Sequence, residues 1–443
     1  MIQNRATLAT SEPRELALSC VEAGIDAAHP RTVVESTVEA RDDDVRIDGT
    51  TYSLREFDEV VVLGAGNAAG QIAAALEAVL GDTVDGGIVV TDDPAETERV
   101  TVARGDHPVP SERGASAAES VRERAEAATD RTLIIAVVGG GGSALLPAPA
   151  GDLSLDGLRT VTDELLASGA TIHEINAVRK HVSAVKGGRL AAAAAPATVV
   201  GLVFSDVVGN DLDVVASGPL SPDPTTYEDA RDVVDRYDLD VPAAVHDRLA
   251  RGVAGELPET PGPGAGVFDR VDTHVLADGL TAVRAAASRA REAGSEPLIL
   301  STRVRGEARE AAKTQVAIAE EAAATGTPVE PPAVLLSGGE TTVTLTGDGT
   351  GGPNQEFALS AAVELAGGDA SVTVASVDTD GIDGATDAAG ALIDETTCDD
   401  ATGALDALAE NDAYPFLAEH DALVETGPTG TNVNDLRVLV VED

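Results

Sequence analysis

The chain has 443 residues, of which 76 are acidic and 30 are basic, and its formal net charge is −46. A surface this acidic repels nucleic acid and anionic membranes, so we expect neither as a partner. The length exceeds what one hydrophobic core usually serves, and this predicts two domains.

The basic residues are almost all arginines. Only Lys180, Lys186 and Lys313 are lysines. An acidic, lysine-poor surface resembles that of proteins from halophiles. Salt screens such a surface, because the Debye length is only about 3 Å at 1 M. A protein of this charge that binds anions is therefore expected to work in high salt.

The chain carries no obvious targeting or membrane signal. Residues 1–15 are polar and lack the apolar core of a signal peptide. The longest apolar stretch, 190–204, is too short to cross a bilayer and contains Pro196. Cys20 and Cys398 form neither a metal-binding nor a disulfide pattern. We expect a soluble, cytoplasmic protein.

The first half of the chain alternates helical and strand-like segments. Apolar periodicity predicts helices over 14–28, 68–80, 116–128, 158–168 and 175–195, and strands over 60–63, 87–90, 132–138 and 197–204. Ser11 is expected to cap the first helix. Continuous apolar strands that alternate with helices predict a parallel sheet covered on both faces, an α/β fold.

The second half begins after a segment rich in proline and glycine. Residues 255–266 contain three prolines and predict an exposed connection, so we divide the chain into domains 1–260 and 267–443. Beyond it we expect helices over 276–293 and 307–324, and strands over 297–300, 334–337, 341–346, 372–377 and 438–441. A β-hairpin is expected to begin at Glu340.

Three predicted strands end in glycines beside hydroxyls or carboxylates. The segments that follow these strands begin with Gly139, Gly140, Gly141, Gly142 and Ser143; with Ser337, Gly338, Gly339 and Glu340; and with Asp378, Thr379, Asp380, Gly381 and, two residues later, Asp383. Successive glycine N–H groups form a concavity that suits phosphate oxygens. Carboxylates suit Mg²⁺, which accompanies nucleotide phosphates. The pattern therefore favours phosphoryl transfer.

A fourth glycine motif leaves two interpretations open. Residues 64–69, which include Gly66 and Asn67, fit the G-x-G-x-x-A pattern between a strand and a helix. Asp92 and Asp93 follow the next strand, where a ribose-binding acid lies in dinucleotide folds. The motif predicts either a nicotinamide site or a glycine turn that packs helix against strand or binds another anion.

Two of the three lysines lie in one short segment. Lys180 and Lys186 are close to Arg179 and His181. A compact ammonium that binds a phosphate or carboxylate explains this placement, and solvated ion pairs are the alternative. We expect His181 to be structural. Asp206 follows a strand, where a metal ligand or general base is expected.

Amide side chains gather in two later loops. Asn354 and Gln355 precede Glu356 at the start of a helix, and Asn434 precedes the final strand. A cluster of turns explains the composition of the last loop, though less readily its asparagines.

Long, ordered motifs resemble a known family. They are GGGGSALL, NAVRKHVSAVKGGRLA, SDVVGNDLDVVASGPLSPDPTT, LLSGGETTVTLTGDGTGGPNQEF, DTDGIDGATDAAGALID and GPTGTNVNDL. Together they are similar to the glycerate 2-kinases of the MOFRL class, from about residue 17 to 440. The resemblance implies ATP-dependent phosphorylation of D-glycerate to 2-phosphoglycerate with Mg²⁺. It also implies an N-terminal Rossmann-like domain and a C-terminal MOFRL-type α/β domain, with the active site in the cleft between them.

The chain departs from the family pattern at two positions. Asn67 stands where the family typically has lysine, and Pro353 stands where it typically has arginine. We expect Arg179, Lys180 and Lys186 to supply the positive charge instead. A substrate other than D-glycerate and loss of activity are the alternatives.

The resemblance and the motifs together assign roles. We expect Asp206 to accept the proton of the glycerate 2-hydroxyl, and Lys186, with Lys180 or Arg179, to stabilise the transferring phosphoryl group. Mg²⁺ is expected at Glu340, Asp380 and Asp383. The residues expected to bind the nucleotide or glycerate are Gly139, Gly140, Gly141, Gly142, Ser143, Gly66, Asn67, Gly338, Gly339, Asn354, Gln355 and Asn434.

Two other functions stay open. A nicotinamide-dependent hydroxypyruvate reductase would use residues 64–69 for the pyrophosphate, and some members of the family have been labelled in this way. A non-catalytic protein that binds glycerate or nucleotide is the third reading. The sequence leaves the product isomer and the oligomeric state open, with a homodimer as one arrangement.

Overall fold

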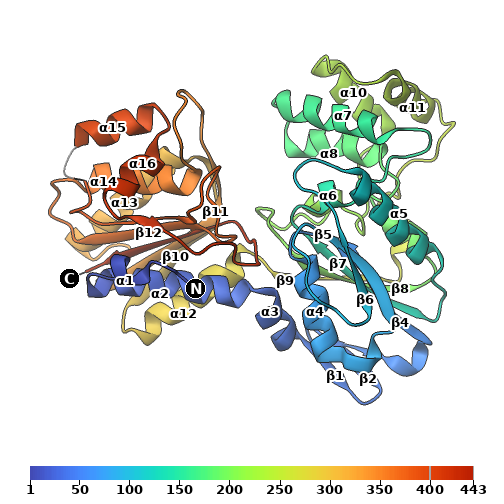
Figure 1. Ribbon diagram of the computed structural model, residues 1–443, viewed down its shortest axis with the longest axis horizontal. Helices are drawn as coiled ribbons and strands as arrows, with labels where there is room; N and C mark the ends of the chain where they lie inside the picture. Colours follow the sequence, from blue (N-terminus) through green and yellow to red (C-terminus); the bar gives the residue numbers. More distant parts are fainter. Residues whose placement is uncertain (399–400, 443) are drawn as a thin grey trace. The chain divides into compact units, whose positions relative to one another are not determined.

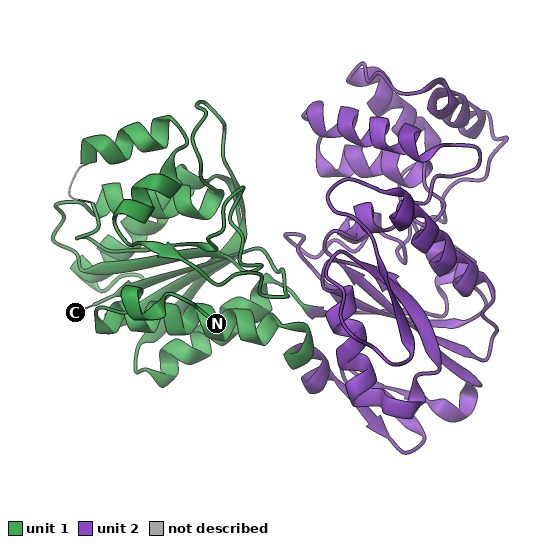
Figure 2. Ribbon diagram, viewed as in Figure 1, with its two compact units in different colours: residues 1–32, 277–443 green, residues 33–276 purple. Residues whose placement is uncertain are grey.

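The computed structural model describes residues 1–398 and 401–442, and they form two compact units (Figure 2). Unit 1 comprises Met1–Thr32 and Ala277–Asp443, and unit 2 comprises Val33–Leu276. The sequence predicts a single division between residues 260 and 267, whereas the first 32 residues pack with the C-terminal half. The reason is an apolar helix: Leu18 and Val21 share a core with Val438 of the last strand.

Unit 2 contains a six-stranded sheet, as the alternating apolar segments predict (Figure 1). In spatial order its strands are β6 (Val100–Arg104), β5 (Gly86–Thr91), β4 (Glu59–Ala65), β7 (Thr132–Gly139), β8 (Thr198–Phe204) and β9 (Val271–Ala277). The pairs from β6 to β8 are parallel. Every residue of β7 is buried, as expected of a central parallel strand covered on both faces.

Helices cover this sheet, and others form a separate helical layer. The helices next to the sheet include α4 (Ala69–Leu80), α5 (Glu112–Glu126), α6 (Gly142–Leu145) and α9 (Arg189–Ala194). The separate layer contains α7 (Leu155–Ala167), α8 (Ile172–His181), α10 (Tyr227–Arg236) and α11 (Ala243–Val253). These four helices share a core that includes Val161, Val178, Tyr227 and Leu249.

In this unit the structure corrects one prediction and adds a sheet that the sequence does not predict. The helix predicted over 175–195 is interrupted, because Gly187 and Gly188 adopt left-handed conformations with φ of 57° and 75°. A small antiparallel sheet of β1 (Val38–Arg41), β2 (Asp44–Ile47) and β3 (Thr50–Ser53) is also present. Its strands are too short and too exposed to produce a clear apolar pattern.

Unit 1 contains a mixed six-stranded sheet. Its spatial order is β10 (Glu296–Glu307), β11 (Ala333–Thr342), β15 (Asp435–Val441), β12 (Val372–Asp378), β13 (Gly390–Ile393) and β14 (Leu423–Val424). β10 and β11 pair in parallel, and the other four pairs in this order are antiparallel. The predicted hairpin after Glu340 is wrong, because β11 pairs with β10 and β15 and residues 343–352 form a loop.

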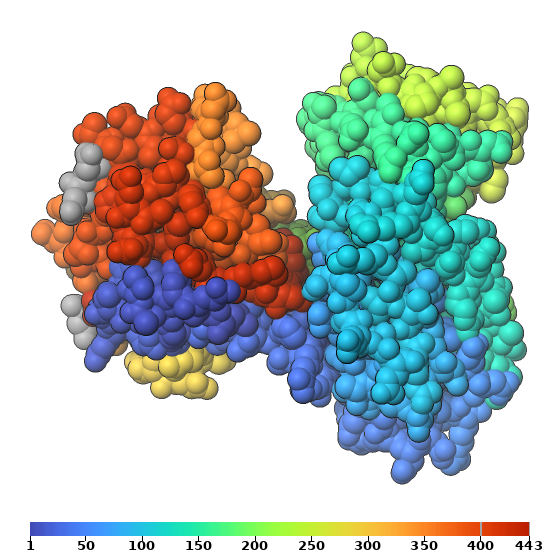
Figure 3. Space-filling view, in the orientation of Figure 1, coloured from blue at the N-terminus to red at the C-terminus, as the bar shows by residue number. Residues whose placement is uncertain are grey.

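Helices cover both faces of this sheet. One face is covered by α2 (Glu12–Ala28) and α12 (Gly279–Glu292), and Ser11 caps α2 as predicted. In the space-filling view the N-terminal helices lie directly against the C-terminal part of the chain (Figure 3). The other face is covered by α13 (Ala308–Thr325) and α14 (Pro353–Leu365). Unit 1 also contains α1 (Arg5–Leu8), α15 (Ala401–Ala409) and α16 (Ala413–Glu419), and α3 (Pro30–Thr37) begins in unit 1 and ends in unit 2.

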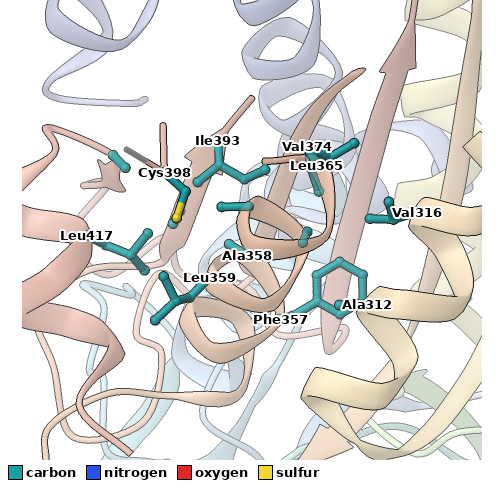
Figure 4. Packing of buried hydrophobic residues seen from close by; sticks show 14 of the residues in the cluster. Ala312, Val316, Phe357, Ala358, Leu359, Leu365, Val374, Ile393, Cys398 and Leu417 are labelled. Carbon is teal, nitrogen blue, oxygen red and sulfur yellow. The ribbon is translucent and has the colours of Figure 1, made fainter. Parts of the chain in front are cut away.

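The core around α14 fixes the position of its N-terminal end. Phe357 is fully buried, and its ring lies beside Ala312 near Val316 of α13 (Figure 4). Leu359 and Leu365 are buried in the same core. Asn354 and Gln355, in the first turn of α14, are therefore held in place by packing further along the helix.

No helix among residues 1–398 and 401–442 combines the length and the apolar character needed to cross a bilayer.

Replacing Phe357 by Ala tests this anchoring. The variant loses a fully buried ring, so we expect the free energy of unfolding of unit 1 to fall by about 3–5 kcal/mol. Denaturant unfolding measures the change. Leu405→Ala is the control, because Leu405 is 54% exposed and its replacement should change stability by less than about 0.5 kcal/mol. Equal losses in the two variants would contradict the prediction.

Candidate active site

Three strands of unit 2 end side by side. The register pairs Ala65 with Val138 and Gly139 with Phe204. The residues that follow these strands, among them Gly66, Gly140 and Asp206, therefore begin at one edge of the sheet. The strand order reverses between β4 and β7, which is where ligands bind in doubly wound sheets.

The glycines after β7 permit close contacts at this edge. A Cβ at Gly140 would lie 2.3 Å from Asp206 Oδ2, and one at Gly141 would lie 1.6 Å from Asn67 Oδ1. Gly141 also has a left-handed φ of 72°. The two glycines are therefore required by the side chains of Asn67 and Asp206.

The carboxylate of Asp206 is a candidate proton acceptor. Burial raises the pKa of Asp206, and the nearby His107 opposes this shift in part. A raised pKa makes a carboxylate a stronger base. The sequence predicts Asp206 but not His107, which lies in a different loop.

Lys186 is buried, and no carboxylate in residues 1–398 or 401–442 pairs with it. Its Nζ donates to the carbonyl oxygens of Ser143, at 2.8 Å, and Leu146, at 3.1 Å. Burial, together with the charge of Arg179, lowers the pKa of Lys186 to about 7. The ammonium is therefore held in position by neutral groups and retains its full positive charge only below neutral pH.

Arg179 adds a second positive charge beside Lys186. Across the described residues Arg179 makes no ion pair, and burial lowers its pKa. Two neighbouring cations without a carboxylate are unusual in a chain of net charge −46. They indicate a place for an anion.

A hydrogen-bonded chain of side chains lies next to Lys186. Ser143 Oγ is 2.8 Å from Ser217 Oγ, which donates to Asn176 Oδ1 at 2.9 Å. Asn176 is 2% exposed, and its Nδ2 is buried with no partner in the described part of the chain. Ser217 has a left-handed φ of 62°. Strain of this kind often occurs at functional sites.

Lys180 is engaged differently from the prediction. Its Nζ contacts Asp213 and Asp223, each at 3.2 Å. Since two carboxylates already balance its charge, Lys180 has less to offer an anionic ligand than Lys186. His181 is buried and contacts the Ala177 carbonyl and Glu259, in agreement with the structural role expected for it.

Unit 1 has a second cluster at one edge of its sheet. Asp435 begins β15 and pairs with Gly339, inside β11, and with Asp378 at the end of β12. Asp435 accepts from Thr341, Arg437 and Asn354. Gly338 and Gly339 lie inside β11 rather than in the loop that the sequence predicts.

Asp383 caps the N-terminus of α14. Its two carboxylate oxygens accept hydrogen bonds from the backbone N–H groups of Asn354, at 3.0 Å, and Gln355, at 2.8 Å. Asn354 is engaged as well, because Nδ2 donates to Asp435 and Oδ1 accepts from Ser376. Both carboxylate oxygens of Asp383 and both polar atoms of the Asn354 side chain therefore take part in the hydrogen bonds that build this edge of unit 1.

Asp378 and Asp380 are crowded carboxylates. Burial and the charge of Asp380 raise the pKa of Asp378, and burial raises that of Asp380. Like charges held close together favour a bound cation or a proton. The structure does not gather the predicted set of Glu340, Asp380 and Asp383, and within the described ranges no three His, Cys, Asp or Glu side chains form a ready metal site.

The remaining predicted residues have distinct settings. Gln355 Nε2 donates to Thr386, and its Oε1 is buried with no partner in the described ranges. The carbonyl of Asn434 accepts from Thr379, and Asn434 has a left-handed φ of 66°. Glu340 is exposed.

Some site residues were missed by the sequence reasoning. Asn176, Ser217 and Asp435 lie within the motifs quoted above, but their roles depend on contacts made across the fold. Their position within those motifs is the one sign in the sequence that could have identified them. Asn176 and Ser217, for example, are 41 residues apart.

Two family models match the chain. A domain of unknown function, DUF4147, matches residues 16–250. The MOFRL family matches residues 333–435.

Similar proteins share nearly the whole length. A glycerate 2-kinase from Pyrococcus horikoshii is 39% identical over 97% of this chain and 97% of its own. A protein from Agrobacterium vitis with a provisional hydroxypyruvate reductase name is 43% identical over 86% of this chain and 99% of its own. The crystal structure of a glycerate kinase from Thermotoga maritima has a TM-score of 0.85 and 37% identity, and the match covers 96% of this chain and 99% of that one.

Replacing Lys186 by Met tests its buried charge. The folded pKa of about 7 lies below the ordinary 10.5, so the unfolded chain binds more protons between these values. In the wild type, the titration of Lys186 should therefore make the free energy of unfolding rise with pH across this interval. Lys186→Met lacks the titrating group and should lack this rise. Between pH 7.5 and 9.5 we expect the wild type to gain on the order of 2 kcal/mol relative to Lys186→Met.

Urea unfolding at several pH values measures this difference. Lys313→Met is the control, since Lys313 is exposed and pairs with Glu310. The control should follow the wild-type pH profile. A Lys186→Met profile that runs parallel to the wild type would show that the ammonium is not destabilised by burial.

Proposed function

Because the chain matches the DUF4147 and MOFRL models and belongs to the glycerate kinase family, we propose that it transfers the γ-phosphoryl group of ATP to D-glycerate. The observation that carries this proposal is the neighbouring pair of Lys186, which is buried, and Arg179, which is half-buried; neither has a carboxylate partner among the described residues.

This pair supports phosphoryl transfer on electrostatic grounds. Buried cations are normally balanced by acids, as Lys180 is by Asp213 and Asp223. Lys186 instead donates two of its three N–H groups to neutral carbonyl oxygens. The third N–H and the Arg179 guanidinium remain for an anion. We assign them to the phosphoryl group, whose charge they stabilise during transfer.

The reaction is an in-line displacement. The 2-hydroxyl oxygen of glycerate forms a bond to the γ-phosphorus, and the bond from this phosphorus to the bridging oxygen of ADP breaks. The proton of the hydroxyl passes to the carboxylate of Asp206. Because burial raises the pKa of Asp206, it accepts this proton more readily than an exposed aspartate. The product is 2-phosphoglycerate.

The acidic cluster of unit 1 fits a divalent cation only in part. Asp383 uses both carboxylate oxygens to cap α14. The crowded pair of Asp378 and Asp380 fits better, because Mg²⁺ is commonly held by one or two carboxylates together with substrate phosphates. We therefore assign Mg²⁺ to Asp378 and Asp380. When bound, the ion would neutralise charge on the nucleotide phosphates.

Reduction of hydroxypyruvate is the second candidate, motivated by the Agrobacterium vitis relative. The glycine motif after β4 supports it weakly. A Cβ at Gly66 would lie 2.9 Å from the Gly139 Cα. This glycine is therefore required for packing against the end of β7, which explains the motif without a pyrophosphate.

An assay of ATP with D-glycerate and Mg²⁺ tests the proposal. We expect 2-phosphoglycerate and ADP, with the isomer identified by ³¹P NMR. Lys186→Met should lower kcat by about 10²-fold or more, because it removes a preorganised charge. Lys313→Met, at an exposed and ion-paired lysine, should leave kcat unchanged.

A parallel assay with hydroxypyruvate and reduced nicotinamide cofactors separates the second candidate. Consumption of the cofactor without phosphorylation of D-glycerate would overturn the proposal. Binding of D-glycerate or ATP without turnover of either substrate pair would instead support a non-catalytic binding protein.

Asp380→Asn tests the cation assignment. The variant keeps the size of the side chain but removes one charge from the crowded pair, so we expect the Mg²⁺ concentration for half-maximal activity to rise about tenfold or more. Calorimetric titration with Mn²⁺ gives a readout that does not depend on turnover. Asp387→Asn is the control, because Asp387 is exposed and contacts the Tyr414 hydroxyl. Unchanged Mn²⁺ binding in Asp380→Asn would refute the assignment.

A further inference from the structure

Asn67 presents a buried oxygen that nothing in the described part of the chain satisfies. Its Oδ1 has no hydrogen-bond partner there. The main chain of this residue is fixed, since its N–H donates to the Gly140 carbonyl at 2.9 Å and its carbonyl accepts from Thr91 Oγ1 at 2.6 Å. A buried acceptor without a partner costs about 1–3 kcal/mol. A ligand that donates a hydrogen bond would remove this cost.

A second acceptor lies against the same turn. Asp206 Oδ2 is 2.3 Å from a Cβ built at Gly140, and Asn67 Oδ1 is 1.6 Å from a Cβ built at Gly141. Two oxygens from different loops thus lie against two consecutive glycines. Any side chain on either glycine would displace one of these oxygens.

The chemistry of this pair selects its ligand. A carboxylate oxygen and an amide oxygen both accept hydrogen bonds, so together they disfavour a carboxylate or phosphate and favour a group with two O–H donors. Hydroxyls on neighbouring carbon atoms provide such donors. In D-glycerate these are the 2-hydroxyl and the 3-hydroxyl.

We propose that Asn67 determines specificity by accepting a hydrogen bond from the 3-hydroxyl of D-glycerate, while Asp206 accepts the proton of the 2-hydroxyl. This inference rests on the proposed kinase function. It follows that Asn67 directs phosphorylation to the 2-position, because it holds the 3-hydroxyl away from Asp206.

The contact predicts discrimination against a substrate that lacks the 3-hydroxyl. D-Lactate has the carboxylate and the 2-hydroxyl of D-glycerate but a methyl group at carbon 3. With D-lactate the Oδ1 of Asn67 would remain buried and unpaired. Sites built to bind a substrate hydroxyl reject analogues without it strongly. We expect the wild type to prefer D-glycerate by about 10²-fold or more in kcat/KM.

The test compares both substrates in the wild type, Asn67→Ala and Asn67→Asp. In Asn67→Ala the preference should fall at least tenfold while kcat/KM for D-lactate changes little. In Asn67→Asp the preference should persist, because an oxygen acceptor remains. The preference is the ratio of kcat/KM for D-glycerate to kcat/KM for D-lactate, both measured on the same enzyme. A smaller fraction of folded protein lowers both values equally and leaves the ratio unchanged. If D-lactate is not turned over, its inhibition constant against D-glycerate replaces its kcat/KM.

The product isomer is a second readout. By ³¹P NMR, Asn67→Ala should form 3-phosphoglycerate beside 2-phosphoglycerate, whereas the wild type forms the 2-isomer alone. A purely structural role for Asn67 would lower both rates equally and leave the isomer unchanged, and this result would overturn the inference. Loss of the preference in Asn67→Asp would also overturn it, by showing that a donor is required. Absence of D-glycerate phosphorylation by the wild type would instead refute the proposed function itself.

Discussion

Strand register is the constraint on which both clusters depend. In unit 2, the pairing of β4, β7 and β8 brings the loops that carry Asn67, Gly140 and Asp206 to one edge. In unit 1, Asp435 begins β15 and pairs with Gly339 of β11 on one side and Asp378 of β12 on the other. A shift of one residue in any of these pairings would turn the polar residues at the strand ends away from their partners. The chemistry of each edge therefore rests on the apolar strands behind it.

The sequence predicts the regular elements of the interior well, because burial imposes apolar patterns. The strand predicted over 132–138 is β7, and the helix predicted over 14–28 is α2 with Ser11 as its cap. The predictions fail where local patterns carry little information. The apolar residues of 175–195 continue through the break between α8 and α9, where two glycines adopt left-handed conformations. Helix α2 packs with β15, a strand more than 400 residues away in the sequence.

In the candidate site too, some residues can be predicted from the sequence and others depend on the fold. Asp206 and Lys186 follow from motif and residue type. The hydrogen bonds of Asp383 and Asn354 cannot be predicted in this way. In the sequence, an aspartate that caps a distant helix looks the same as an aspartate that binds a metal. Only the fold reveals that these side chains are already engaged. The resemblance to a family identifies the segments that matter, and hydrogen bonds then show which residues within them remain available to a ligand.

Lys180 and Lys186 illustrate why residue type alone is insufficient. They lie six positions apart and both are buried, yet one meets two carboxylates and the other meets two carbonyl oxygens. The first arrangement neutralises the lysine within the protein. The second holds Lys186 in place without a carboxylate partner among the described residues, so below its pKa of about 7 the ammonium charge is not balanced by an acid. An anionic ligand gains most from the second, because it does not have to displace an existing partner. Uncompensated charge, rather than the presence of lysine, thus distinguishes the candidate catalytic group.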